Sequence, residues 1–302
     1  MDLSSKIILI SGPTASGKSN FAIELAKKVK GEIINADSMQ VYKELKILTA
    51  RPNPKDYQKI KHHLYGFLNV TKKFSTGQWL KLSQKKIEEI RKRKKIPTFV
   101  GGTGLYFKAS TDGLVKIPSI PLKVRSKIRN LQKKLGQKKF YSKLLKLDKN
   151  MKGKIVETDV QRSIRAYEVM YHTKKSLYDW FKNTKSKFLE DDFIKIYIDY
   201  PRQDLIQRIA KRTDQMMKIG AIKEVKKFLK IKIKRENSSN KVIGISEIRE
   251  LLDEKLNLDQ VKEKITIKTR QYAKRQSTWA RGQMMNWKKL EPQDLKKFLK
   301  NI

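Results

Sequence analysis

The 302-residue chain contains no cysteine, only three histidines, and no run of apolar residues long enough to cross a membrane. The lack of cysteine excludes disulfide bonds, thiolate zinc sites and cysteine nucleophiles, and it agrees with a reducing cytoplasm. The lack of a long apolar run argues against a membrane anchor. We therefore expect a soluble cytoplasmic protein that does not contact a membrane.

Acidic residues are also scarce. Only 30 of them stand against 71 lysines and arginines, which gives a net charge of +41. A field of this size attracts polyanions and makes copies of the chain repel one another, which favours a monomer. Lysine accounts for 56 of the basic residues and arginine for 15. Much of the lysine excess fits a solvated surface, whereas arginine is hard to replace where two hydrogen bonds hold a phosphate, so arginine positions carry more weight.

Near the amino end an apolar run, 7–10, leads into a glycine-rich segment and then into a helix-forming run, 20–29. Strand, G-x-x-x-x-G-K-S and helix in this order are typical of a phosphate-binding loop. The backbone N–H groups of such a loop converge on one point, and the following helix adds the positive end of its dipole. Ser19 supplies a hydroxyl that can ligate Mg²⁺. The residues expected to bind a diphosphate or triphosphate are Gly12, Pro13, Thr14, Ala15, Ser16, Gly17, Lys18 and Ser19.

Apolar strand-like runs alternate with helical patterns, an order that predicts an α/β fold with a doubly wound parallel sheet. After the first run, these strands are expected at 32–35, 96–100 and 193–198. Between about 116 and 190 the strand-like runs disappear and helical spacing takes over in a lysine-rich segment. We therefore predict a P-loop core, 1–115 and 191–302, with an inserted helical subdomain at 116–190.

A single carboxylate, Asp37, follows the second predicted strand. It lies at the edge where open α/β sheets bind their ligands. From this segment alone Asp37 can be a general base, a ligand of a magnesium-bound water, or the N-cap of a following helix.

The strand at 96–100 ends in Gly101-Gly102-Thr103, where a P-loop hydrolase usually has an aspartate for Mg²⁺. This argues against an ATPase or GTPase. The glycines would allow a ligand to approach the backbone closely, with the Thr103 hydroxyl as a hydrogen-bond partner. A simple strand-to-helix turn explains the same residues equally well.

Arginines recur at helical spacing in two places. Arg162 and Arg165 are three residues apart in the predicted insert, and Arg208 and Arg212 are one turn apart after the last predicted strand. Paired guanidinium groups suit successive phosphates, although a solvated basic face is the commoner use of such spacing. The second pair is placed to reach back toward the phosphate loop.

Five segments in this order resemble the tRNA dimethylallyltransferases, also called tRNA isopentenyltransferases, over nearly the whole chain. The segments are 12–19, 37–42, 101–106, 161–166 and 271–279. The family transfers a dimethylallyl group from its diphosphate to the exocyclic amine of the adenosine on the 3′ side of the anticodon. The resemblance implies a prenyltransferase whose partners are dimethylallyl diphosphate and the anticodon stem-loop of tRNA, with Mg²⁺ as cofactor.

The resemblance also implies roles for residues. The phosphate loop holds the prenyl diphosphate, Asp37 is the general base for the attacking amine, and Thr103 is a polar contact near the reacting groups. Arg212 matches an arginine that steadies the leaving diphosphate. The implied tRNA-contacting residues are Asp37, Ser38, Met39, Gln40, Thr103, Arg125, Gln161, Arg162, Ser163, Ile164 and Arg165.

Two other functions fit part of the pattern. The same loop and carboxylate would serve a small-molecule P-loop kinase or an adenylate prenyltransferase, but neither requires a helical insert or a basic C-terminal helix. A non-catalytic RNA-binding protein would explain the charge, but it would not need an intact phosphate loop.

Overall fold

The computed structural model describes residues 3, 5–57, 59–182, 184–234 and 236–302. The chain divides into two compact units, of which the first combines Met1–Thr111 with Phe188–Ile302 and the second is Asp112–Lys187. Among the described helices, none has both the length and the apolar character needed to span a bilayer.

A six-stranded sheet with strand order β3-β2-β4-β1-β5-β6 is the centre of the first unit, and all its neighbouring strands are parallel. The predicted parallel α/β core is therefore confirmed. The four strands expected from apolar runs are present, and two short strands that the sequence did not indicate, β3 and β6, extend the edges. The strands are β1 (Ile7–Ser11), β2 (Gly31–Asn35), β3 (His62–His63), β4 (Ile96–Gly101), β5 (Phe193–Ile198) and β6 (Lys288–Leu290).

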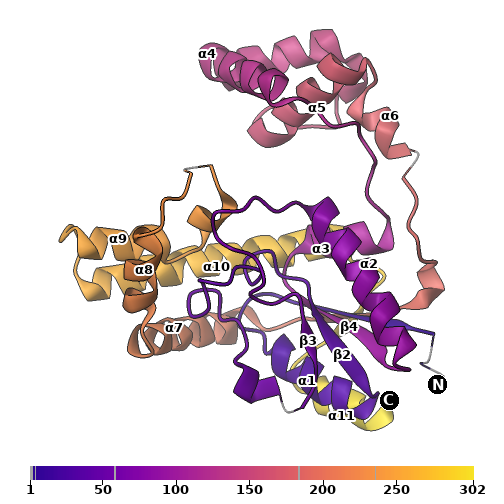
Figure 1. The fold of residues 1–302 in the computed structure, drawn as a ribbon, viewed down its shortest axis with the longest axis vertical. Coiled ribbons are helices and arrows are strands. Elements are labelled where there is room, and N and C mark those ends of the chain that lie inside the picture. The colour runs from indigo at the N-terminus through magenta and orange to yellow at the C-terminus, as the bar shows by residue number, and fades with distance from the viewer. Residues whose placement is uncertain (1–2, 4, 58, 183, 235) are drawn as a thin grey trace. The chain divides into compact units, whose positions relative to one another are not determined.

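Helices cover both faces of this sheet, because its central strands bury alternate side chains on opposite sides. On one face, Ile8 and Ile10 of β1 pack with the apolar side of α1 (Lys18–Lys28), and α11 (Asp294–Asn301) lies beside α1 (Figure 1). The ring centroids of Phe21 and Phe298 are 6.1 Å apart across that helix pair.

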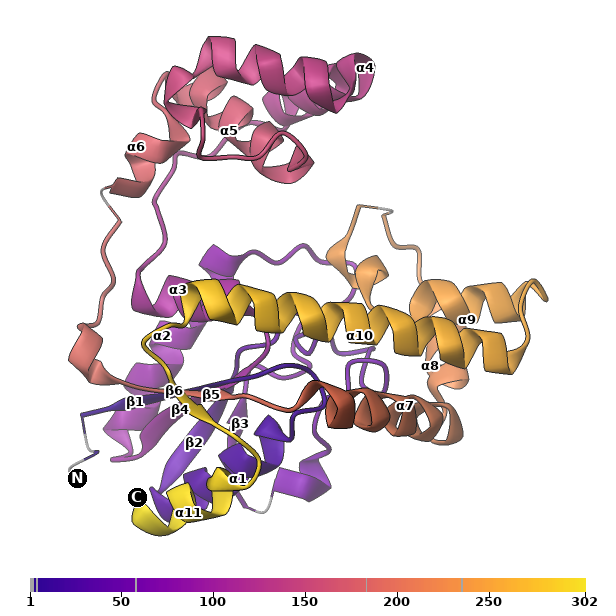
Figure 2. The same cartoon turned by 180° about the vertical axis from the view of Figure 1, so that it is seen from behind.

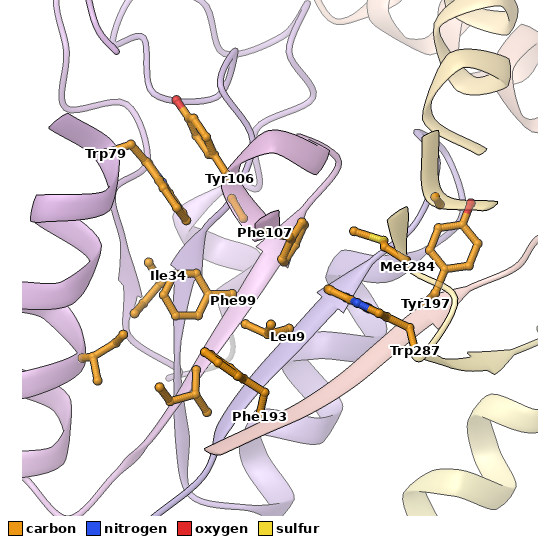
Figure 3. Close-up of a cluster of buried hydrophobic side chains, with 14 of the residues drawn as sticks. Leu9, Ile34, Trp79, Phe99, Tyr106, Phe107, Phe193, Tyr197, Met284 and Trp287 are labelled. Atoms are coloured by element: carbon orange, nitrogen blue, oxygen red, sulfur yellow. The ribbon is translucent and has the colours of Figure 1, made fainter. Parts of the chain in front are cut away.

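On the opposite face, α2 (Thr76–Lys92) and α3 (Gly104–Thr111) pack on the sheet through large aromatic side chains (Figure 3). Trp79 is fully buried and stacks on Tyr106, with ring centroids 4.1 Å apart. Its Nε1 donates a hydrogen bond of 2.8 Å to the backbone carbonyl of Asn35. This contact fixes α2 to the carboxyl end of β2, where the functional residues begin.

The helices after β5 form a further apolar cluster with segment 41–48. Of these helices, α7 and α10 lie side by side (Figures 1 and 2). Because α7 runs away from the carboxyl end of β5, its inner face is brought next to the phosphate loop. The helices are α7 (Arg202–Lys218), α8 (Ala221–Leu229), α9 (Ile245–Leu252) and α10 (Leu258–Gln283).

The second unit is helical and has its own apolar core. Its helices are α4 (Leu122–Leu147), α5 (Val160–Thr173) and α6 (Leu177–Lys182). Within α4 the backbone is broken at Gly136, which has a left-handed φ of 70° that glycine adopts without a steric penalty.

Short 3₁₀ turns occur in both units, at Pro54–Tyr57, Lys149–Met151, Glu190–Asp192 and Ser238–Lys241.

Candidate active site at the carboxyl end of the sheet

The phosphate loop connects β1 to α1 through two residues with left-handed backbone, Ala15 (φ 66°) and Gly17 (φ 84°). Gly17 precedes the helix and offers no side-chain cap, so the first N–H groups of α1 are available to another acceptor. The Ser16 hydroxyl oxygen is buried and has no hydrogen-bond partner within the described residues. Free N–H groups at the positive end of a helix form an anion site, as the motif predicts.

Two arginines of α7 hold this loop in place. The Arg208 Nε donates to the Ala15 carbonyl at 2.8 Å, and an Arg212 guanidinium nitrogen donates to the Thr14 hydroxyl at 2.8 Å. The predicted approach of this arginine pair to the phosphate loop is thus seen directly. Because Arg212 uses one nitrogen on the loop and lines a cavity with the rest of the fork, it can contact the loop and a ligand at once.

Lys18 carries the titratable charge of the loop. Its Nζ donates to the Pro13 carbonyl at 3.1 Å, and the side chain lines the same cavity as Asp37 and Arg212. Burial lowers the pKa of Lys18 to about 8, with Asp37 opposing the change and Arg212 adding to it. Burial also lowers the pKa of Arg212, again opposed by Asp37. The two cations therefore lie in a site that lacks enough negative charge to balance them.

Asp37 does not cap a helix, so that reading of the sequence is wrong. No α-helix begins before Thr76 in the described part of this segment, and the Asp37 Oδ1 instead accepts a hydrogen bond from the Met39 N–H at 2.9 Å. The buried Asn35 side chain accepts from the Asp37 N–H and donates to the Asp37 carbonyl. These bonds fix the backbone of Asp37 at the end of β2 and leave the other carboxylate oxygen for a ligand.

Thr103 lies beside this carboxylate segment. Its hydroxyl accepts from the Ser38 N–H at 2.9 Å and lies 3.2 Å from the Ser38 hydroxyl. Thr103 therefore joins the ends of β2 and β4, two strands whose loops are 65 residues apart in the chain.

The neighbouring glycines are close to protein atoms, and Gly101 also lines the cavity that contains Lys18 and Asp37. A Cβ at Gly101 would lie 2.1 Å from the Ala36 carbonyl, and one at Gly104 would lie 2.3 Å from the Trp279 ring. Because real Cβ atoms do not approach this closely, glycine at these positions lets the loops after β2 and β4 and helix α10 come together.

Gln276 joins the same loops, a role that its position in a basic helix did not suggest. Its Oε1 accepts from the Thr14 N–H at 2.8 Å, and its Nε2 donates to the Gly102 carbonyl at 2.9 Å. One amide thus ties the phosphate loop to the end of β4. The contacts span 262 and 174 residues of sequence, so only tertiary structure reveals them.

A second carboxylate, Glu224 of α8, holds the segment after Asp37. Its two oxygens accept from the N–H groups of Lys46, Ile47 and Leu48 at 2.8, 2.8 and 3.0 Å. This loop also receives the Gln40 side chain, whose Nε2 donates to the Thr49 carbonyl at 2.9 Å. Glu224 therefore shapes a wall of the site without facing its centre.

Two cavities meet at the site. The larger has a volume of about 750 Å³ and is lined by Lys18 and Ser19 of the phosphate loop. The smaller has a volume of about 280 Å³, exposes more apolar than polar surface, and is lined by Tyr272 and Arg275 of α10 among other residues. The residues that line both cavities are Thr14, Asp37, Thr49, Arg212 and Met216. Asp37 and Arg212 thus lie where the cavity lined by the phosphate loop adjoins the more apolar cavity.

Residues expected to contact tRNA fall in both units. Ser38, Met39 and Gln40 lie in the loop after Asp37, and Arg125 is in the first turn of α4. In α5, Gln161 and Arg162 are exposed and Arg165 is partly exposed. The structure corrects two members of that run, because the Ser163 and Ile164 side chains are buried in the helical unit and do not face solvent.

The sequence matches two family models. One, described as IPP transferase, matches residues 40–283, and the other, described as isopentenyl transferase, matches residues 5–69. The chain belongs to the IPP transferase family. The resemblance drawn from the five sequence segments is confirmed.

Relatives named tRNA dimethylallyltransferase align over the full chain. The one from Pelagibacter ubique (strain HTCC1062) is 61% identical over 302 residues, which is 100% of this chain and 96% of the relative. The one from Rickettsia massiliae (strain Mtu5) is 43% identical over 298 residues, which is 98% of this chain and 82% of the relative.

Solved structures of the IPP transferase family share the fold. The full-length tRNA isopentenylpyrophosphate transferase from Bacillus halodurans superposes with a TM-score of 0.70 and 29% identity, covering 98% of this chain and 95% of that one. A eukaryotic dimethylallyltransferase described as acting on tRNA gives a TM-score of 0.81 and 30% identity, covering 95% and 73%.

Prenyltransferases of this family use a divalent metal. Within the described residues, no group of three or more His, Cys, Asp or Glu side chains could hold a metal ion. Oxygen ligands near the loop include the Ser19 hydroxyl and the Asp37 carboxylate, which line the same cavity. Such a sparse set suits an ion that takes most of its ligands from a bound diphosphate and water.

Proposed function

We propose that this chain transfers a dimethylallyl group from dimethylallyl diphosphate to the N6 amine of the adenosine 3′-adjacent to the anticodon of tRNA, with release of diphosphate. The observation that carries the proposal is the shared wall of the two cavities, in which Asp37 and Arg212 face both a phosphate-binding loop and an apolar space. A prenyl diphosphate has this same division between a charged and an apolar end.

The charged end of the donor fits the larger cavity. The N–H groups of the loop, the Lys18 ammonium and the Arg212 guanidinium are placed to stabilise negative charge as it develops on the leaving diphosphate. Since the loop backbone is held by the Arg208 and Gln276 contacts, and Lys18 and Arg212 bond to the same loop, before the donor binds, little reorganisation is needed during the reaction.

The acceptor needs a base, and Asp37 is proposed for that role. As the bond from the adenosine N6 to the allylic carbon forms, the bond from that carbon to the diphosphate oxygen breaks, and Asp37 takes the N6 proton. Burial and the Asp37 charge raise the pKa of Tyr272, so this phenol stays neutral beside the carboxylate. Thr103 holds the Ser38 backbone and offers a polar contact near the base.

Magnesium is the metal we propose, held by the Ser19 hydroxyl together with oxygens of the bound diphosphate. When bound, the ion would neutralise charge on the leaving group. The contribution of the protein is the hydroxyl and the loop geometry that places it next to Lys18.

The tRNA is proposed to contact both units through Asp37, Ser38, Met39, Gln40 and Thr103 in the first, and through exposed arginines in the second. The target adenosine lies in a stacked loop, so it must turn out of the stack to enter a cavity. The net charge of +41 supports binding to the RNA backbone and a monomer, and the lack of cysteine supports a cytoplasmic location.

The test is incubation of the protein with dimethylallyl diphosphate, Mg²⁺ and tRNA that carries adenosine beside the anticodon, followed by mass spectrometry of the nucleosides. Asp37→Asn should lower turnover by about 100-fold or more, as expected when a general base is removed, while the variant should still bind tRNA. Asp204→Asn, an exposed position on α7, is the matched control. The absence of modified adenosine with the unaltered chain, or conversion of ATP to ADP without tRNA, would overturn the proposal.

A further inference from the structure

A buried acid lies next to two arginines of the helical unit, and a third arginine is close to one of them. Glu168 of α5 is 3% exposed, although it carries a charged group. The Arg129 Nε lies 3.5 Å from its Oε1, and an Arg165 guanidinium nitrogen lies 3.9 Å from its Oε2. Arg125 stands one helical turn before Arg129 on α4 and acts electrostatically on Arg165. We call Arg125, Arg129 and Arg165 the arginine cluster.

Hydrogen bonding in this group is incomplete. Within the described part of the chain, the buried Glu168 Oε1 and the buried Arg125 Nε have no hydrogen-bond partner. A buried polar group without a partner usually costs about 1–3 kcal/mol. Because α4 and α5 already pack through a continuous apolar core, these buried polar groups are not required to hold the two helices together.

The exposed fractions of the side chains show that the guanidinium groups, and not the carboxylate, reach solvent. The side chains of Arg129 and Arg165 are 53% and 39% exposed, whereas that of Glu168 is 4% exposed. Two guanidinium groups, those of Arg129 and Arg165, lie beside one carboxylate, and Arg125 adds a third positive charge near Arg165. Burial lowers the pKa of Arg165, and Arg125 adds to this effect while Glu168 opposes it. Arg129 and Arg165 therefore present positive charge to solvent.

We propose that Glu168 is a positioning residue that holds the arginine cluster to receive a phosphodiester group of the tRNA backbone, and that Arg129 is a direct contact to that phosphate. The inference rests on the proposed function and adds two residues to those that the family resemblance implies. A planar guanidinium fork matches the oxygens of a phosphodiester, and fixing it beforehand reduces the entropy lost on binding.

The variant Glu168→Gln separates positioning from general attraction. It removes a negative charge, so attraction to RNA by net charge alone predicts tighter binding. The proposal predicts weaker binding, because an amide no longer holds the guanidinium groups; we expect the Kd for tRNA to rise about 5-fold or more. Glu157→Gln changes the charge equally at an exposed position in the same unit and is the matched control.

Substitution of Arg129 provides a second test. Its side chain is exposed and lies outside the apolar core, so removing it leaves that core intact. For Arg129→Ala, the slope of log K against log salt for tRNA binding should decrease by about one unit, the value for one lost phosphate contact. Arg129→Lys keeps the charge but loses the fork and should recover only part of the affinity. Lys133→Ala, which removes an exposed charge from the same helix, is the control for Arg129→Ala.

Both experiments use the full chain at a temperature well below the unfolding transition of each variant, checked by circular dichroism. The KM for dimethylallyl diphosphate and kcat at saturating tRNA should stay unchanged in the control variants Glu157→Gln and Lys133→Ala. Equal tRNA affinity of Glu168→Gln and Glu157→Gln, or an unchanged salt slope in Arg129→Ala, would overturn this inference while the prenyl transfer itself stands. Failure of the unaltered chain to modify tRNA would instead overturn the proposed function.

Discussion

The pH dependence of donor binding follows from Lys18. In the free protein, burial lowers the pKa of this ammonium to about 8. A bound diphosphate places negative charge beside it and must raise that pKa, so binding favours the protonated form. Affinity from this group is therefore complete below about pH 8 and is lost as the pH rises through that value.

The size of the effect follows from the fraction of free protein with neutral Lys18. With a pKa of about 8, that fraction is about one-tenth at about pH 7 and about nine-tenths at about pH 9. The affinity for dimethylallyl diphosphate should fall about 10-fold between these two pH values, and binding at the higher pH should take up about 0.9 proton.

Isothermal titration calorimetry checks both numbers. Dimethylallyl diphosphate is titrated into the protein with a chelator present to remove divalent metal. Repeating the titration in two buffers of different ionisation enthalpy gives the number of protons taken up. Lys18→Arg keeps the charge at all these pH values, so its affinity should change much less with pH. An unaltered chain whose affinity changes less than about 2-fold and takes up no proton would refute the reasoning.

Three further predictions concern contacts that shape the site. Gln276→Ala removes hydrogen bonds to two loops, so the unfolding free energy should fall by about 1–3 kcal/mol and the KM for dimethylallyl diphosphate should rise; an unchanged thermal melt would contradict this. Glu224→Gln leaves at least one N–H of segment 46–48 facing an amide N–H, so hydrogen exchange of that segment should accelerate about 10-fold or more, and unaltered exchange would show that the segment is held otherwise. Gly101→Ala drives a Cβ into the Ala36 carbonyl and should cost several kcal/mol of stability, about 3 or more, by denaturant titration. The control Gly282→Ala meets open space and should be neutral or slightly stabilising, so equal losses at both glycines would contradict the steric argument.

Local pattern was enough for the phosphate loop and for most of the sheet. The loop depends on residues adjacent in sequence: Gly17 supplies the left-handed backbone that it needs, and Lys18 places its ammonium group against the loop that it belongs to. The four longer strands are continuous apolar runs, which a strand buried on both faces requires. Strands β3 and β6 have two and three residues, too short to give a periodic signal, and they exist because a neighbouring strand offers its edge.

The positions of two residues of the site could also be predicted from their neighbours in sequence. Asp37 was placed at the sheet edge by the strand before it, and Arg212 was placed toward the loop by helical spacing from Arg208. What the sequence left open was the environment of Asp37, where a base, a metal ligand and a helix cap were equally compatible. The hydrogen bond to Met39 and the two adjoining cavities removed the cap from that set.

The sequence by itself determined the phosphate loop, the parallel α/β core and the helical insert, because each arises from residues close together in the chain. Tertiary structure alone decided why Gly101 and Gly104 must be glycine, how Gln276 joins two loops, and which acid lies beneath the arginine cluster. Those properties depend on atoms brought together from distant segments, and a side chain at one position carries no local signal of the partner that folding places against it.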